Sequence, residues 1–88
     1  MKTTSLKQLL EVLIDRSKFL GTYKTDVREA QELLEYNEYG LCFDTLITQM
    51  YEYDINIDRD FYSLICEIGS KLEIEEKEYN FMKELIKS

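Results

Sequence analysis

Residues 33–46 read LLEYNEYGLCFDTL, and this stretch decides the fold of the chain. Apolar residues leading into it recur at the spacing of three and four that is typical of a helix: Val27, Ala30, Leu33 and Leu34. Asn37 suits the end of this helix, because asparagine tolerates the left-handed backbone that closes helices. A second helix is predicted from Glu38 or Tyr39 to about Tyr53. The turn between them is short, so the two helices should form an antiparallel hairpin.

The inner face of the second helix follows from the same spacing. Its expected members are Cys42, Thr45 or Leu46, Gln49 or Met50, and Tyr53. Gly40 stands near the start of this helix, where it either weakens the helix or marks a close approach between the two helices.

A further helix is predicted before the hairpin. Ser5 and Gln8 form a capping box, so this helix should begin near Ser5, and it should end before Gly21. Its apolar face has helical spacing: Leu6, Leu9, Leu10, Leu13 and Ile14. Thr25 or Asp26 is the expected N-cap of the next helix.

After the hairpin, residues 54–57 read as a short extended connection, and Asp58 should cap another helix. One face of that helix is apolar: Phe61, Leu64, Ile65, Ile68 and Leu72. A fifth helix is predicted over residues 73–88, burying Tyr79, Met82, Leu85 and Ile86. The sequence therefore predicts an all-α fold. It is a compact single-domain bundle over residues 1–88, with four to five short helices around a central helical hairpin.

The composition excludes several functions. A chain of 88 residues supports one domain, and the absence of histidine removes the usual general base and metal ligand. The net charge of −7 argues against nucleic acid or an anionic membrane surface as a direct partner, because binding phosphates needs lysine and arginine. No apolar run approaches the roughly 20 residues of a spanning helix. Since residues 1–16 do not resemble a signal peptide, we expect a cytoplasmic protein.

The cysteines and carboxylates do not form a recognisable catalytic site. Cys42 and Cys66 lack a CxxC pattern and are interpreted as buried thiols, with one disulfide as the alternative. Alternate polar residues from Asp54 to Asp60 imitate a calcium loop, but Arg59 replaces its essential glycine and Ile65 its bidentate glutamate. A helix-capping turn is the better interpretation. No nucleophile, phosphate loop or metal-ligand spacing accompanies the carboxylates, so we expect no enzyme, cofactor or metal.

The charge is regional. Residues 1–28 carry a net charge of +3, residues 29–70 a net charge of −9, and residues 71–88 a net charge of −1. The basic groups of the first helix include Lys2, Lys7, Arg16 and Lys18. The glutamates along the hairpin helix that ends at Asn37 recur every third residue: Glu29, Glu32, Glu35 and Glu38. They form either an ordinary solvated helix face or an anionic ridge for a basic partner, and the basic first helix is a further source of neutralising contacts.

Tyrosines are interleaved with carboxylates in the acidic centre, where five of the seven tyrosines lie between residues 36 and 62. Tyrosine is enriched at the energetic centres of protein interfaces, and surrounding carboxylates steer a basic partner toward them. The alternative is that the tyrosines fill the edge of the core while the acids keep the surface soluble. Because Tyr36 and Tyr39 are three residues apart, at least one of them should pack inward.

The central region resembles a known family. Glu38-Tyr39-Gly40-Leu41, Leu46 and Tyr51-Glu52-Tyr53-Asp54-Ile55 are similar to the MafI-type immunity proteins of bacterial polymorphic toxin systems, and more broadly to helical immunity proteins of contact-dependent growth inhibition. The resemblance covers roughly residues 27–72. This chain has Asn37 where glycine is common and Cys42 where alanine is common.

The resemblance implies an inhibitor that binds a cognate toxin domain in the cytoplasm, often a nuclease and frequently a ribonuclease. The candidate partner-binding residues are carboxylates and tyrosines: Glu35, Tyr36, Glu38, Tyr39, Glu52, Tyr53, Asp54, Asp58 and Asp60. The expected complex holds one copy of this chain, while a weak homodimer of the free protein stays open. The alternative function is a non-enzymatic adaptor or regulatory subunit that binds a basic protein.

Overall fold

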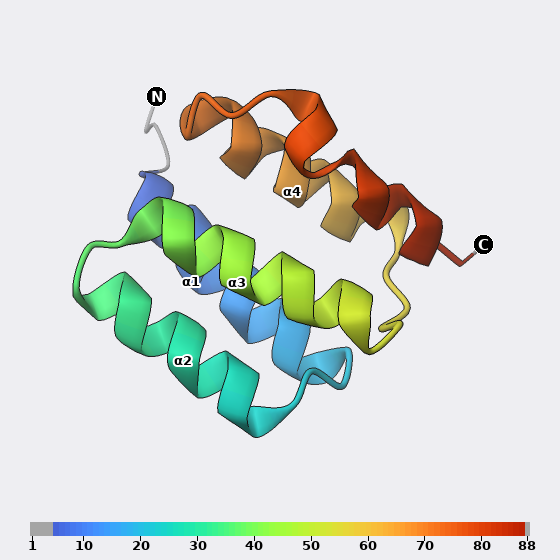
Figure 1. Ribbon diagram of the computed structural model, residues 1–88, viewed down its shortest axis with the longest axis horizontal. Coiled ribbons are helices and arrows are strands. Elements are labelled where there is room, and N and C mark those ends of the chain that lie inside the picture. Colours follow the sequence, from blue (N-terminus) through green and yellow to red (C-terminus); the bar gives the residue numbers. More distant parts are fainter. Residues whose placement is uncertain (1–4, 88) are drawn as a thin grey trace.

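In a computed structural model that describes residues 5–87, the chain forms four α-helices and two 3₁₀ helices and contains no strand (Figure 1). The α-helices are α1 (Leu6–Phe19), α2 (Lys24–Glu35), α3 (Tyr39–Glu52) and α4 (Arg59–Lys71). The 3₁₀ helices are η1 (Glu76–Glu78) and η2 (Asn80–Leu85). The predicted all-α fold is confirmed.

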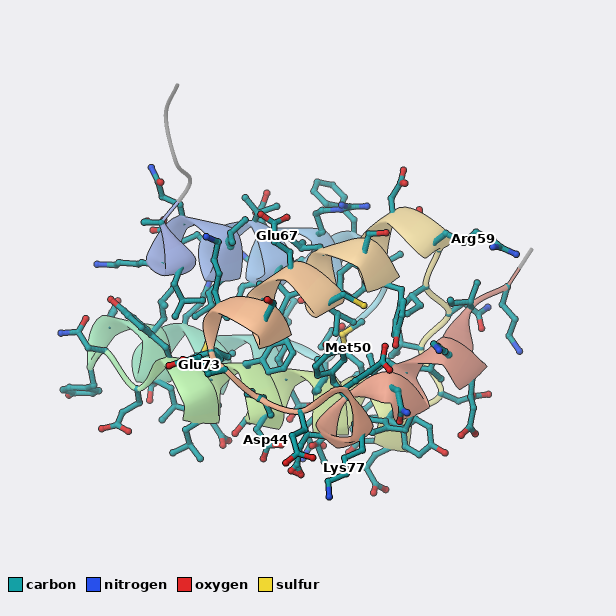
Figure 2. The ribbon with its side chains drawn as sticks, turned by 90° about the horizontal axis from the view of Figure 1, so that it is seen from above. Asp44, Met50, Arg59, Glu67, Glu73 and Lys77 are labelled. Atoms are coloured by element: carbon teal, nitrogen blue, oxygen red, sulfur yellow. The ribbon has the colours of Figure 1, made fainter. Side chains whose placement is uncertain are left out.

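The helices surround one apolar core. α2 and α3 pack side by side as the predicted hairpin, and α1 lies behind α3 in Figure 1, in contact with the other three α-helices. α4 and the 3₁₀ helices cover the opposite side. Met50 of α3 lies in the interior, whereas Arg59 and Lys77 point away from the molecule (Figure 2). The largest fully buried side chains include Phe43, Phe61, Leu10, Leu13, Leu46, Ile47 and Met50.

The four α-helices end in the same way, in a Schellman motif. In each, a backbone N–H beyond the helix donates to a carbonyl five residues earlier: Thr22 to Ser17 (3.2 Å), Glu38 to Leu33 (2.9 Å), Ile55 to Met50 (3.0 Å) and Ile74 to Gly69 (3.0 Å). The residue before each donor has a left-handed backbone: Gly21 (φ 101°), Asn37 (φ 60°), Asp54 (φ 54°) and Glu73 (φ 59°). The predicted ends at Gly21 and Asn37 therefore agree with the structure.

The helix starts agree with the sequence in two cases. The capping box of α1 is present, since the Gln8 backbone N–H donates to Ser5 Oγ (3.2 Å) and the Ser5 N–H donates to Gln8 Oε1 (3.0 Å). Asp58 caps α4 by accepting from the Phe61 N–H (2.7 Å). The N-cap predicted for α2, Thr25 or Asp26, was wrong. The helix begins at Lys24, its N-cap residue is Tyr23, and no side chain forms a capping hydrogen bond.

The prediction of a fifth α-helix over residues 73–88 was also wrong. Residues 76–85 form 3₁₀ turns instead, and their buried side chains are Tyr79, Met82 and Leu85. Their spacing of exactly three residues fits the three residues per turn of a 3₁₀ helix better than the 3.6 of an α-helix. An isolated parallel bridge joins Ile57 to Ile86 and fixes this segment to the start of α4. The predicted end of the helix at Ser88 lies outside the described residues.

Of the two interpretations of Gly40, the close approach between the hairpin helices is not found. A Cβ atom placed on Gly40 would meet nothing within 4 Å, whereas one placed on Gly69 would meet the ring of Tyr79. The inner face of α3 consists of Cys42, Phe43, Leu46, Ile47 and Met50. Tyr53 does not belong to it, because α3 ends at Glu52 and the Tyr53 side chain is 49 % exposed.

Candidate functional site

The predicted partner-binding residues fall into separate groups. One group surrounds the α2–α3 turn: Glu35, Tyr36, Glu38 and Tyr39. The other lies at the C-terminal end of α3: Glu52, Tyr53 and Asp54. The 14 residues of α3 separate these groups by about 20 Å, at opposite ends of the hairpin in Figure 1. Eight of the nine predicted residues are exposed, and Tyr39 is half-buried.

At the α2–α3 turn, the two tyrosines differ. Tyr36 is 78 % exposed. Tyr39 packs against the core and its hydroxyl lies 3.2 Å from the Asn37 side-chain oxygen. One of the two tyrosines therefore packs inward, as the sequence predicted. Glu35 borders an open groove of about 420 Å³ between α1 and α2, which Lys7 and Lys18 also line.

At the other end of α3, Tyr53 is paired with Tyr23, a residue that the sequence did not single out. The ring centroids lie 4.3 Å apart, with the ring planes tilted by 49°. Tyr23 is the N-cap residue of α2 and Tyr53 the C-cap residue of α3, so the pair joins two helix ends. The sequence holds no local signal for this pair, because Thr25 and Asp26 are better N-cap residues than Tyr23 and the two tyrosines are 30 positions apart.

Asp58 and Asp60 lie at the start of α4. Asp58 caps the helix and its Oδ1 lies 3.7 Å from Arg16 Nη2. The Arg16 guanidinium also lies over the ring of Phe61, 5.7 Å from its centroid. Basic Arg59 and Lys87 line the same shallow depression as both aspartates. Asp58 therefore has a structural role, and its acidity is partly compensated within the chain.

The remaining tyrosines hold the C-terminal segment to α3 and α4. The Tyr51 hydroxyl donates to Glu84 Oε1 (3.0 Å), and its ring meets Phe81 edge-on. The hydrogen bond to the Glu84 carboxylate raises the pKa of Tyr51. Burial raises the pKa of Tyr62 to about 12, and its buried hydroxyl has no hydrogen-bond partner within residues 5–87.

Cys42 lacks the environment of a reactive thiol. Cys42 is buried in the core, and burial raises its thiol pKa to about 11. This disfavours the nucleophilic thiolate. Cys66 is half-buried and, like Cys42, is a free thiol. Within residues 5–87, no group of three or more His, Cys, Asp and Glu side chains is arranged to hold a metal ion.

Comparisons of this chain with models of known families, with curated proteins and with solved structures find no match. In the described part of the chain, no helix has both the length and the apolar character needed to cross a bilayer.

The α2–α3 hairpin presents exposed tyrosines beside carboxylates at both of its ends. Such a surface is suited to binding a basic macromolecule.

Proposed function

We propose that this chain is an immunity-type inhibitor that binds a basic bacterial toxin domain in the cytoplasm. The toxin is a nuclease in this proposal, and ribonuclease is the favoured activity. The supporting observation is the exposure of side chains that carry the family resemblance: Glu38, Glu52, Tyr53 and Asp54. Because these side chains lie outside the core, they are accessible to a partner. No lysine or arginine occurs from residue 29 to residue 58.

The mechanism would be occlusion. A nuclease holds phosphates with basic side chains, and exposed carboxylates on an inhibitor occupy the same positions. Long-range attraction between the acidic hairpin and a basic active site accelerates their encounter. Aromatic side chains buried at the contact then set the rate of dissociation. This chain supplies no catalytic group, cofactor or metal in the proposal.

The experiment starts with the purified chain as bait in an extract of its native host, followed by mass spectrometry of the eluate. The inhibitor proposal expects one basic toxin fragment in a 1:1 complex, whose nuclease activity falls to zero at equimolar inhibitor. Recovery of a basic protein without toxic activity would instead favour an adaptor or regulatory subunit.

Charge-reversed variants test the surface. We expect slower association with the fragment, and a flatter salt dependence, when four carboxylates become lysine: Glu35, Glu38, Glu52 and Asp54. A matched control makes the same change in net charge elsewhere, at four other exposed positions: Glu67, Glu73, Glu76 and Glu78. Equal association rates for the two variants would contradict docking on the hairpin, because net charge alone would then explain the effect.

A further inference from the structure

The Tyr23–Tyr53 pair is an aromatic contact on the surface of the protein. Tyr23 is 54 % exposed and Tyr53 is 49 % exposed, although the rings touch each other. The start of α2 and the end of α3, which carry the pair, lie at the end of the hairpin away from the α2–α3 turn (Figure 1). Exposed aromatic rings on a rigid element offer contact area at low entropic cost, which favours a role in binding.

Several local rules of helix chemistry are broken at this position. Tyr23 occupies an N-cap and makes no capping hydrogen bond, where serine, threonine or aspartate would stabilise α2. Asp54 has a left-handed backbone (φ 54°) in a Schellman position where glycine is the usual residue. Natural sequences break such rules mainly at functional sites. Three exceptions meet here, because Glu52 and Asp54 also place negative charge at the negative end of α3.

A cation from a partner would stabilise the carboxylates beside the pair, Glu52 and Asp54. The last turn of α3 contains no basic residue, and the ion pairs within residues 5–87 include neither Glu52 nor Asp54. A positive group at a helix C-terminus is favourable, and a carboxylate there is not. Lys24 follows Tyr23 in the chain, but it lines a depression between α1 and α2 together with Lys18 and Arg28.

The α2–α3 turn lacks this combination. Tyr36 is exposed but has no aromatic neighbour among the described ring pairs, and Tyr39 is half-buried. Glu38 is the N-cap residue of α3, where the positive end of the helix favours a carboxylate. Glu35 is the last residue of α2, whose last turn also lacks a basic residue, but it shares its groove with Lys7 and Lys18. The negative charge at this end of the hairpin is therefore partly compensated within the chain.

We propose that the Tyr23–Tyr53 pair, with Glu52 and Asp54 beside it, is the docking surface for an arginine side chain of a basic protein partner. Arginine fits better than lysine, because its planar guanidinium stacks on aromatic rings while its N–H groups reach carboxylates. The inference rests on the proposed function for the identity of the partner. It does not rest on it for the chemistry of the surface.

The test uses two short peptides as probes, blocked hexa-arginine and blocked hexa-lysine, titrated into the isotope-labelled full chain and followed by NMR. Hexa-arginine should shift the signals of residues 23 and 52–54 most strongly, and should bind about three- to fivefold more tightly than hexa-lysine. Largest shifts at residues 35–39, or equal affinities for the two peptides, would overturn the proposal.

Matched variants complete the experiment. Tyr53→Ser should reduce hexa-arginine binding about three- to fivefold, and the isosteric E52Q/D54N variant should reduce it without risk to the fold. Leu41→Ser removes an exposed apolar side chain near the other end of α3 and should leave binding unchanged. Loss from Leu41→Ser alone would refute the assignment.

The two proposals fail separately. Peptide binding at the pair without recovery of any toxin would contradict the proposed function only. A toxin that the wild type and Tyr53→Ser neutralise with equal affinity would contradict the arginine docking surface only.

Discussion

Replacing Gly69 with alanine should destabilise the protein, although alanine is the better helix former. Gly69 lies in α4, and a Cβ atom there would stand 2.9 Å from Cδ2 and 3.0 Å from Cζ of Tyr79, and closer still to Cε2. Ordinary contacts of a Cβ atom begin near 3.4 Å. The Tyr79 ring is 6 % exposed and meets Phe43 edge-on, with centroids 6.3 Å apart. The ring therefore cannot withdraw without moving the core.

The size of the effect follows from two opposing terms. Overpacking a core costs about 1–3 kcal/mol, and alanine in place of glycine within a helix returns about 1 kcal/mol. The difference is about 0–2 kcal/mol, and because the nearest ring atom would lie well inside 3.0 Å, we expect the upper half of this range, a net loss of about 1–2 kcal/mol in the free energy of unfolding. For a domain of this size, that loss corresponds to a fall of roughly 5–15 °C in Tm.

Gly40→Ala is the matched control for this prediction. Gly40 is also helical, but a Cβ atom there would meet nothing within 4 Å, so this variant should gain about 0.5 kcal/mol. Urea denaturation of the two variants and the wild type gives the comparison. The Gly69→Ala change should also cost less in a Tyr79→Leu background. A Gly69→Ala protein as stable as the wild type would refute the steric argument.

Further predictions concern backbone strain, a buried hydroxyl and alkaline stability. Glu73→Gly should raise the free energy of unfolding by about 1 kcal/mol, because Glu73 has φ 59° and the left-handed region penalises side chains. Glu67→Gly, at an exposed position within α4, should lower the free energy of unfolding by about 0.5–1 kcal/mol. If urea denaturation shows that both glycine variants are less stable than the wild type, Glu73 is not strained. Tyr62→Phe removes a buried hydroxyl without a hydrogen-bond partner and should keep or raise Tm. Tyr51→Phe loses the hydrogen bond to Glu84 and should lower Tm. A lower Tm for Tyr62→Phe than for Tyr51→Phe would argue that the Tyr62 hydroxyl has a partner. The pKa of the Cys42 thiol rises from 9.0 to about 11 on folding, so the folded state keeps a proton that the unfolded state loses. This contribution to the free energy of unfolding is complete below pH 9 and is lost as pH rises toward 11, with a slope of at most about 1.4 kcal/mol per pH unit. Denaturation measured from pH 8 to pH 11 should therefore show a shallower decline in the free energy of unfolding for Cys42→Ala than for the wild type. Parallel curves would count against the burial of this thiol.

The hairpin could be predicted from the sequence because its signals are local. The apolar stripe of α2 repeats at helical spacing, and Asn37 closes that helix with the backbone that asparagine tolerates. The capping box at Ser5 and the cap at Asp58 are likewise decided by residues within one turn. Each of these motifs stabilises its helix end wherever the helix lies, so tertiary packing does not change it.

The errors occurred where tertiary contacts decide the outcome. Thr25 and Asp26 are better N-caps than Tyr23, but α2 begins at Lys24, where the ring of Tyr23 pairs with a ring from another helix. The segment after Ile74 has the composition of a helix. Its bridge to Ile57 and the spacing of its buried side chains instead favour 3₁₀ turns.

The candidate site was only partly predictable for the same reason. The list of exposed carboxylates and tyrosines needs only composition and spacing, and eight of its nine members are exposed. Their division between two ends of α3 depends on helix length and direction. The partnership of Tyr53 with Tyr23 joins residues 30 positions apart, and no local pattern in the sequence reports it.

The parallel bridge between Ile57 and Ile86 also governs how the native protein opens. Two backbone hydrogen bonds hold the bridge, from the Ile57 N–H to the Leu85 carbonyl (3.0 Å) and from the Lys87 N–H to the Ile57 carbonyl (3.1 Å). The 3₁₀ turns that it anchors have weaker hydrogen-bond geometry than the α-helices. This segment should therefore open first as a unit, and its amides should exchange hydrogen faster than those of α3. Since the opening unit contains neither Tyr23 nor Tyr53, partial unfolding leaves the proposed arginine surface intact.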